Sequence, residues 1–238
     1  MIIEVVYLNA GPPSVVSPAE TNADINAILA TWNPNFLLGT EATGDGSLPR
    51  RRPKYPGKVR DTTPVNKANL FGYFDRKFEA EWKIMKLDFP RRPGKKGNIP
   101  ARALFKGNYE GAQVIDGHHP PGWRGTDAAR AEYRKALKRT MAPWTRDDWL
   151  EEWDTPEKRA AAKARPRLLG WDCNMTNAEV RAFAREVGGE VVGGNIDCFV
   201  VRHMKVLSWE YTRMVGRHEL HTDHPWGCLR AKLRFEGG

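Results

Sequence analysis

Two short stretches, Asp172-Cys173-Asn174 and Thr222-Asp223-His224-Pro225, decide how this chain is interpreted. The first follows an apolar run typical of a β-strand. Side chains two residues apart in a strand point the same way, so Asp172 and Asn174 share one side. The second stretch places the carboxylate of Asp223 beside the imidazole of His224. A carboxylate that orients water, an amide that steadies charge and an imidazole assisted by a cation are components of a site that cleaves phosphodiesters.

Outward from these stretches, polar residues recur where strand-like runs end. The four runs, each with its polar residue, are Ile2–Leu8 with Asn9, Phe36–Thr40 with Glu41, Ala112–Asp116 with His118, and Arg167–Trp171 with Asp172. Reactive side chains gather where strand ends meet loops on a rigid scaffold. One such residue is weak evidence, since Asn9 alone suits turn chemistry, but the ordered series indicates a site.

The remaining sequence shows no internal repeat and no interdomain linker. Apolar residues at helical spacing predict helices over 25–32 and 126–140, and Thr176-x-x-Glu179 is a capping box that begins a third helix. The charged stretch 144–165 predicts an exposed helix. Further strands are expected at 68–74, 195–201, 205–211 and 228–235. We therefore expect a single domain over residues 1–238.

Positive charge is concentrated in one segment. Residues 50–106 hold 17 Lys and Arg against 5 Asp and Glu, and the rest of the chain holds 21 against 24, so this segment carries the surplus behind the formal charge of +9. Gly and Pro interrupt the basic clusters, which indicates loops. The segment favours a polyanionic partner over a solvated basic surface without a partner. The candidate nucleic-acid-binding residues are Arg50, Arg51, Arg52, Arg91, Arg92, Lys95 and Lys96.

Composition sets the broad class. The chain has 238 residues, of which 40% are hydrophobic, which is enough for a folded core. No apolar run approaches the ~20 residues that span a bilayer, and the first residues lack the basic start of a signal peptide. Three widely spaced cysteines without a C-x-x-C pair indicate reduced, packed thiols. We expect a cytoplasmic monomer with no membrane segment.

The ordered series Asn9, Glu41, His118, Asp172-x-Asn174, Ile196-Asp197 and Asp223-His224 resembles the motifs of the endonuclease/exonuclease/phosphatase superfamily, the DNase I-like fold. The match spans nearly the whole chain in the family's order. It departs from the family pattern at Trp171, which separates Gly170 from Asp172, and at Thr222, which replaces a serine. The resemblance implies an α/β fold: a four-layer sandwich of two mainly antiparallel sheets, packed face to face and flanked by helices.

The resemblance also implies a cofactor, Mg²⁺ with Mn²⁺ as the alternative, and a role for each residue. The implied metal ligands are Asn9, Glu41 and Asp223, and the implied catalytic residues are His118, Asp172, Asn174, Asp197 and His224. Asp172 would orient and deprotonate the attacking water, and Asn174 would hydrogen-bond the phosphate or the water. His224 would contact the phosphate, held by Asp197. His118 would assist the leaving oxygen, with the adjacent His119 as the alternative for that position.

Mg²⁺ prefers oxygen ligands, usually one or two carboxylates with water and phosphate, which suits the implied set. Two other features are weighed beside it. His218-Glu219-Leu220-His221 is one residue short of the zinc-protease signature, so His218 and His221 are interpreted as loop residues near the site. Trp226 directly follows the Asp-His-Pro stretch and is a candidate for stacking on bases, although packing is the expected role of most tryptophans.

Three functions remain in contention. The first is a metal-dependent phosphodiesterase that hydrolyses nucleic acid, DNA before RNA, as an endonuclease or an exonuclease. The second is the same chemistry on a small phosphoester such as a phosphoinositide or a nucleotide. The third is a non-catalytic nucleic-acid-binding protein on a nuclease fold, which the intact set of acids argues against. The salt dependence of binding separates a polymeric substrate from a small one.

Overall fold

The computed structural model describes residues 1–12, 14–42, 47–49, 54–60, 70–76, 78–81, 87–89, 99–102, 104–119, 127–141, 155–194 and 196–235. The helices are α1 Pro18–Thr31, α2 Asp127–Met141, α3 Pro156–Ala164 and α4 Asn177–Glu186. The strands are β1 Ile2–Asn9, β2 Phe36–Thr40, β3 Gly57–Arg60, β4 Phe71–Phe74, β5 Glu79–Glu81, β6 Leu87–Phe89, β7 Ile99–Arg102, β8 Leu104–Tyr109, β9 Ala112–His118, β10 Arg167–Asp172, β11 Glu190–Gly193, β12 Asp197–Arg202, β13 Met204–Thr212, β14 Met214–Val215, β15 His218–Glu219 and β16 Cys228–Phe235.

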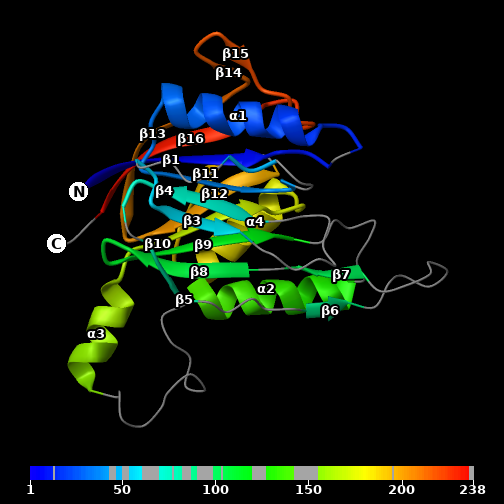
Figure 1. Cartoon of the computed structure of the whole chain (residues 1–238). Helices are drawn as coiled ribbons and strands as arrows, with labels where there is room; N and C mark the ends of the chain where they lie inside the picture. The colour runs from blue at the N-terminus through cyan, green and yellow to red at the C-terminus, as the bar shows by residue number, and fades with distance from the viewer. Residues whose placement is uncertain are drawn as a thin grey trace.

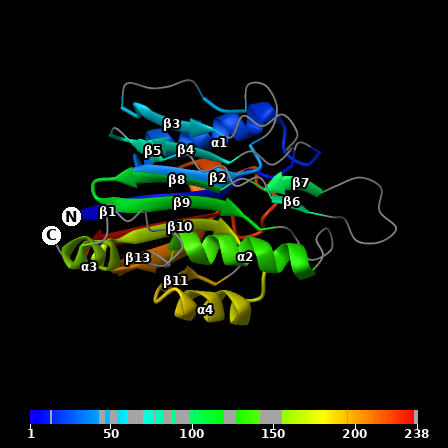
Figure 2. The ribbon, with the colours of Figure 1, turned by 90° about the horizontal axis from the view of Figure 1, so that it is seen from below.

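Two sheets of six strands each dominate the part of the chain that the structure describes. The first sheet has the order β13-β16-β1-β2-β4-β3, and the second has the order β11-β12-β10-β9-β8-β5. One core cluster lies between the sheets, a second joins the outer face of the second sheet to α2 and α4, and a third joins the outer face of the first sheet to α1. The layers are therefore helix, sheet, sheet and helix, as Figures 1 and 2 show. The expected four-layer α/β sandwich is confirmed.

Each sheet contains one parallel pair near its centre, and its other pairings are antiparallel. In the first sheet β1 runs parallel to β2, and Asn9 lies opposite Thr40. In the second sheet β9 runs parallel to β10, and His118 lies opposite Asp172. Parallel strands end at the same edge of a sheet, so each pair delivers two polar residues to one place. The antiparallel partner β12 begins at that edge, with Asp197 opposite Asp172.

The two sheets approach closely beneath this edge. A Cβ atom placed on Gly170 in β10 would lie 2.8 Å from Leu38 in β2 and 2.9 Å from the ring of Tyr7 in β1. Glycine is therefore required for the contact between the sheets at this point. The close approach lets the Tyr7 hydroxyl of the first sheet reach the backbone of the second, where the Asp172 N–H donates to it at 2.8 Å.

Sequence expectations hold for most elements and are wrong about some boundaries. The helix expected over 25–32 begins at Pro18, because Ser17 and Glu20 form a capping box ahead of the apolar face. The capping box at Thr176 is confirmed, and it starts α4. Of the helix expected over 144–165, the described part is α3. The three cysteines are free and buried, as expected.

Two further sequence expectations concern the basic segment and membrane-spanning segments. The seven basic residues proposed to contact nucleic acid, Arg50, Arg51, Arg52, Arg91, Arg92, Lys95 and Lys96, lie outside the described residues. Within the described part of the chain, every helix is too short or too polar to cross a membrane.

Candidate active site

Asp172, the last residue of β10, lies at the centre of the convergent strand ends. Its carboxylate is held on both oxygens: the Asn174 side-chain amide donates to Oδ1 at 2.8 Å, and the Asn9 amide donates to Oδ2 at 3.0 Å. His118 Nε2 lies 3.1 Å from the same Oδ2. The carboxylate is buried, and its three partners come from both sheets and from the loop after β10. Its orientation is therefore fixed before any substrate arrives.

The adjacent histidines His118 and His119 have different surroundings. His118 faces the carboxylates, with Nε2 at 3.1 Å from Asp172 and 3.9 Å from Glu41 Oε1, while Thr40 Oγ1 lies 2.9 Å from its Nδ1. His119 is buried on the other side of the strand end, where its ring packs edge-on against Tyr133. The structure thus brings His118 to the site and places His119 in the core.

His224 and Asp197 form a second hydrogen-bonded pair beside Asp172. His224 Nδ1 is hydrogen-bonded to Asp197 Oδ2, and the Trp226 indole N–H donates to the same oxygen at 3.2 Å. The Tyr211 hydroxyl donates to the backbone carbonyl of Asp197. The carboxylate is buried, and these contacts fix Asp197 through both its side chain and its backbone. Asp197 in turn fixes the ring orientation of His224.

Asn9 connects the two hydrogen-bonded groups. Its amide nitrogen lies 3.2 Å from His224 Nε2 as well as 3.0 Å from Asp172 Oδ2. The Gly11 backbone N–H donates to the Asn9 side-chain oxygen at 3.0 Å, which fixes which end of the amide faces the site. Thr222 ties the segment down, because its hydroxyl donates to the Asn9 carbonyl at 2.6 Å and accepts from the His224 N–H at 3.1 Å.

The contact between Asn9 and His224 depends on which nitrogen of the His224 ring carries a proton. An amide N–H can donate to Nε2 only when that nitrogen carries no proton, while Nδ1 donates to Asp197. A proton on Nε2 breaks this contact and leaves a charged donor that needs an acceptor. Within the site Asp172 Oδ2 is an acceptor, and a phosphate oxygen of a substrate would be another. Protonation of Nε2 therefore exchanges the contact with Asn9 for a contact with one of these acceptors.

Burial and charge shift the titration of these groups. Burial, and next the negative charge of Asp197, raise the pKa of Asp172 well above its usual value. Burial acts to lower the pKa of His224, but the hydrogen bond and charge of Asp197 outweigh it and raise that pKa to about 9. Perturbed groups of both kinds in one place are typical of acid–base sites.

Glu41 and Asp223 lie at the more accessible side of the site. The Glu41 side chain is 19% exposed and its backbone has φ of 64°, an uncommon conformation for a non-glycine residue that often marks functional positions. Asp223 is exposed and flanks the turn after β1, because a Cβ on Gly11 would lie 3.2 Å from Asp223 Oδ1. The carboxylates of Glu41 and Asp223 are therefore accessible to solvent, beside the buried carboxylates of Asp172 and Asp197.

The residues present suit a divalent cation. The negative charge of Glu41 is among the causes that raise the pKa of Asp172, so carboxylates crowd together here and a cation would relieve them. Ligand atoms of Asp172, Asp197 and His224 lie within 4.8 Å of one another, but the hydrogen bonds among them already engage these groups. Mg²⁺ favours few carboxylates and several waters, which fits the accessible Glu41 and Asp223 better than the closed buried set.

Several supporting residues were not foreseen from the sequence. Tyr7 precedes Asn9 by two positions, so strand alternation puts both side chains on the same face of β1, and this signal was available. Thr40 could have been found in the same way, since it ends β2 opposite Asn9. Tyr211 carries no local signal, because its contact with the Asp197 carbonyl joins β13 to the start of β12 across the fold.

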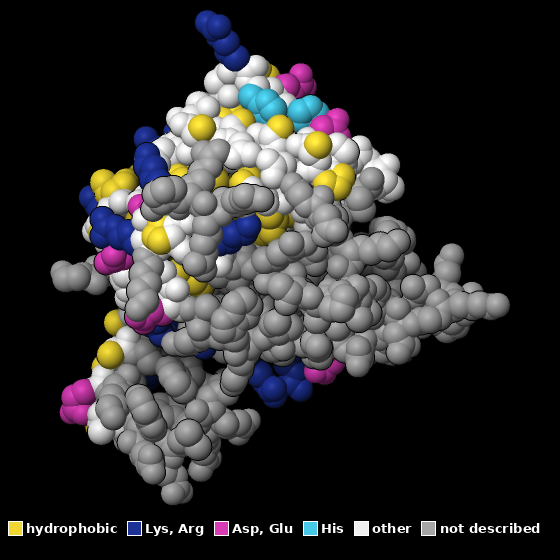
Figure 3. All heavy atoms as spheres, viewed as in Figure 1, with side chains coloured by type: hydrophobic (Ala, Val, Ile, Leu, Met, Phe, Trp, Pro, Cys, Tyr) yellow, Lys and Arg dark blue, Asp and Glu magenta, His cyan; other side chains and the backbone are white. Residues whose placement is uncertain are grey.

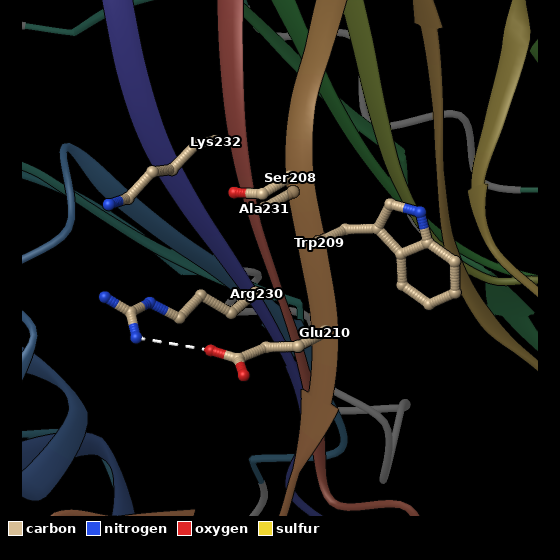
Figure 4. A pocket seen from close by; sticks show the side chains of 6 residues that line it. All are labelled: Ser208, Trp209, Glu210, Arg230, Ala231 and Lys232. Atoms are coloured by element: carbon tan, nitrogen blue, oxygen red, sulfur yellow. Dashed lines mark hydrogen bonds and ion pairs between the residues drawn. The ribbon is translucent and has the colours of Figure 1, made fainter.

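A separate hollow lies on the strand pair β13 and β16 (Figure 4). Its lining residues are Ser208, Trp209, Glu210, Arg230, Ala231 and Lys232. The guanidinium of Arg230 is paired with Glu210 at 3.3 Å and with Glu4 at 2.7 Å, so its charge is already balanced. None of the candidate active-site residues lines this hollow, so it is a separate feature of the surface.

Comparisons with known proteins place the fold. No family model and no curated protein sequence matches this chain. The catalytic domain of human Nocturnin, solved with a bound sulfate anion, has a TM-score of 0.62 at 13% identity, over 98% of this chain and 94% of that one. TDP2 of D. rerio, solved with a single strand DNA product, gives 0.61 at 11% identity, over 98% and 99%. The cytolethal distending toxin of Haemophilus ducreyi gives 0.57 at 11%, over 99% and 98%.

These similarities run through nearly the whole length of each chain. At such low sequence identity they show a shared fold, and a fold does not by itself determine an activity. The ordered motifs had predicted the same architecture, and the strand ends that carry them meet at one edge of the sandwich. The chain therefore has the DNase I-like fold.

Proposed function

We propose that this protein is a Mg²⁺-dependent phosphodiesterase that hydrolyses nucleic acid, with DNA as the preferred substrate. The observation that carries the proposal is the convergence of Asp172 and His224, whose ligand atoms lie within 4.8 Å of each other and which are held in place by Asn174 and Asp197 respectively. A water-orienting carboxylate and an imidazole that can hold a proton are thereby kept side by side at an accessible rim. That pairing suits in-line attack of water on a phosphate.

In the proposed mechanism Asp172 accepts the proton of the attacking water. Its raised pKa brings it closer to the working pH and makes it a stronger base than an ordinary carboxylate. Asn174 and His118 hold the carboxylate so that one geometry is presented. His118 also lies between Asp172 and Glu41, where its Nε2 can donate to whichever oxygen carries more charge.

His224 stabilises charge on the phosphate from the other side. With a pKa of about 9 it carries a proton at neutral pH, and the Asp197 carboxylate keeps the ring oriented. Glu41 and Asp223, supported by Asn9, would hold the cation. Mg²⁺ bound there would neutralise negative charge on the phosphate and favour departure of the leaving oxygen.

Two observations support nucleic acid as the substrate. Residues 50–106 carry the chain's surplus of positive charge, and a basic segment in a chain that also carries a phosphodiesterase site favours a polyanionic polymer. One of the structural neighbours, TDP2 of D. rerio, was solved with a single strand DNA product. Mn²⁺ as an alternative ion, the single-domain monomer and the cytoplasmic location stay predictions.

The test is cleavage of labelled supercoiled plasmid and linear duplex DNA by the parent, Asp172→Asn and His224→Ala, with Mg²⁺ and with EDTA. We expect Mg²⁺-dependent nicking that both substitutions abolish, and that a control substitution at an exposed histidine, His203→Asn, preserves. Trimming from linear ends without nicking would identify an exonuclease. A folded parent that binds DNA without cleaving it would refute the enzymatic proposal.

A salt titration then identifies the substrate class. Binding of a DNA duplex to Asp172→Asn should weaken steeply as salt rises, because the basic segment displaces counterions from the phosphates. A shallow dependence, combined with hydrolysis of a small phosphoester and no cleavage of DNA, would instead assign the same chemistry to a small substrate.

A further inference from the structure

A second group of histidines and a carboxylate lies apart from the active site. Asp24 in α1 faces His218 of β15 and His221 of the following loop. Its Oδ1 lies 2.7 Å from His218 Nε2 and 2.8 Å from His221 Nδ1. Figure 3 shows histidine side chains beside acidic ones at this part of the surface, over α1 and the β14–β15 hairpin. The prediction that His218 is a loop residue is wrong, because His218 lies in β15, whereas His221 lies in the loop that follows.

The carboxylate at the centre of this group is unusual for a helix surface. Asp24 is 1% exposed, whereas the side chains of His218 and His221 are 29% and 41% exposed. Its second oxygen, Oδ2, accepts the backbone N–H of His221 at 2.8 Å. This bond aims Oδ1 at the two rings. The arrangement is a buried, oriented oxygen that faces one nitrogen from each of two partly exposed rings.

The separations among the three ligand atoms suit one small cation. All three lie within 4.8 Å of one another. A tetrahedral ion with bonds of 2.0–2.2 Å needs ligand atoms separated by about 3.4 Å. The two nitrogens lie about 0.6–0.7 Å closer than that to Oδ1, as hydrogen-bonded groups do, so a movement of about that size in two partly exposed rings would complete the coordination. A ligand set of two imidazoles and one carboxylate favours Zn²⁺ and other transition-metal ions over Mg²⁺.

The backbone around the group is held in place independently. The Leu220 N–H donates to the Arg213 carbonyl at 2.8 Å, and the Arg213 guanidinium donates to the Leu220 carbonyl at 3.1 Å. Leu220, between the two histidines, is buried. The hairpin thus presents His218 and His221 from a fixed position, which is what a preformed site requires.

We propose that Asp24 Oδ1, His218 Nε2 and His221 Nδ1 bind one Zn²⁺ ion, with water as the fourth ligand. The ion replaces the two protons that now join the rings to the carboxylate. It ties α1 to the segment 218–224, which also carries Thr222 and His224 into the active site. The role is structural, since the group contains none of the proposed catalytic residues, and it does not depend on the proposed function.

The experiment is titration of the whole protein with Zn²⁺, followed by calorimetry, and with Co²⁺, followed by visible absorption, in excess Mg²⁺. The variants are His218→Gln, His221→Gln and Asp24→Asn. Glu41→Gln is the matched control, because it alters the proposed Mg²⁺ site and leaves the second group intact. Circular dichroism of each variant confirms folding before titration.

We expect one Zn²⁺ per chain in the parent and in Glu41→Gln, a tetrahedral Co²⁺ spectrum, and dissociation constants raised at least tenfold in each histidine variant. Zn²⁺ should also raise the midpoint of thermal unfolding of the parent and of Glu41→Gln, but not of the histidine variants. Binding that is lost in Glu41→Gln and kept in the histidine variants would overturn the proposal, as would no binding by the folded parent.

Discussion

The two groups of acids and histidines in this molecule share components and differ in construction. In the active site, the partners of Asp172 come from β1, β9 and the loop after β10. Its neighbour Asp197 is held by Tyr211 of β13 and by Trp226 of the loop between β15 and β16. In the second group, Asp24 from α1 meets one hairpin and its loop, and both rings remain partly exposed.

This difference in construction decides what each group can do. Burial raises the pKa of Asp172 and lets the charge of Asp197 dominate His224, so the active site has two groups poised to exchange protons. In the second group two partly exposed rings share one buried oxygen, an arrangement that suits a bound ion.

Removal of the Asp172 charge should have the largest effect. Asp172→Asn keeps the shape and the contact with Asn174 but cannot accept a proton from water, so we expect kcat to fall about 10³-fold. Single-turnover cleavage of labelled duplex measures it, with His203→Asn as the control. If Asp24→Asn lowers kcat as much as Asp172→Asn does, the two groups are not functionally distinct.

The stability of the metal-free protein should fall as pH rises. The folded-state pKa of His224 is raised from 6.5 to about 9, so its stabilising contribution is complete below pH 6.5 and is lost as pH rises through 9. The shift corresponds to about 3 kcal/mol in the free energy of unfolding. Urea denaturation in EDTA between these pH values, for the parent and His224→Gln, measures it. An equal slope in both proteins would contradict the raised pKa.

The second group should contribute to stability even without a metal ion. Asp24→Asn exchanges an oriented, buried carboxylate for an amide, which weakens its charge-assisted contacts with two rings and a backbone N–H. We expect the free energy of unfolding in EDTA to fall by about 2 kcal/mol. Chemical denaturation measures the change, and His203→Asn is again the control. A loss that appears only when Zn²⁺ is present would mean that the metal-free hydrogen bonds contribute nothing.

Much of the fold and of the active site follows from strand ends. Asn9, His118 and Asp172 were predictable because each closes a strand whose apolar pattern is local, and parallel pairing then brings the ends together. Polar supports such as Tyr211 were not predictable, because their partners lie in other strands. The Asp24 group was missed for the same reason, since its ligands are separated by 194 and 197 positions.

The smallest effect is expected at Trp226, whose indole N–H donates to Asp197 Oδ2 at 3.2 Å and whose ring lies beside His224, with the ring centroids 5.3 Å apart. Trp226→Phe keeps an aromatic ring beside His224 and removes the N–H. The oxygen then has one partner fewer, so its orientation is looser and its charge acts more fully on His224. We expect kcat to fall less than tenfold, since Asp197 keeps its hydrogen bond with His224 and the lost N–H acts on the reaction only through that carboxylate. We also expect the alkaline limb of the pH–rate profile to move to higher pH. Its movement to lower pH would show that the indole N–H, rather than competing with His224 for Asp197, helps to keep that histidine protonated.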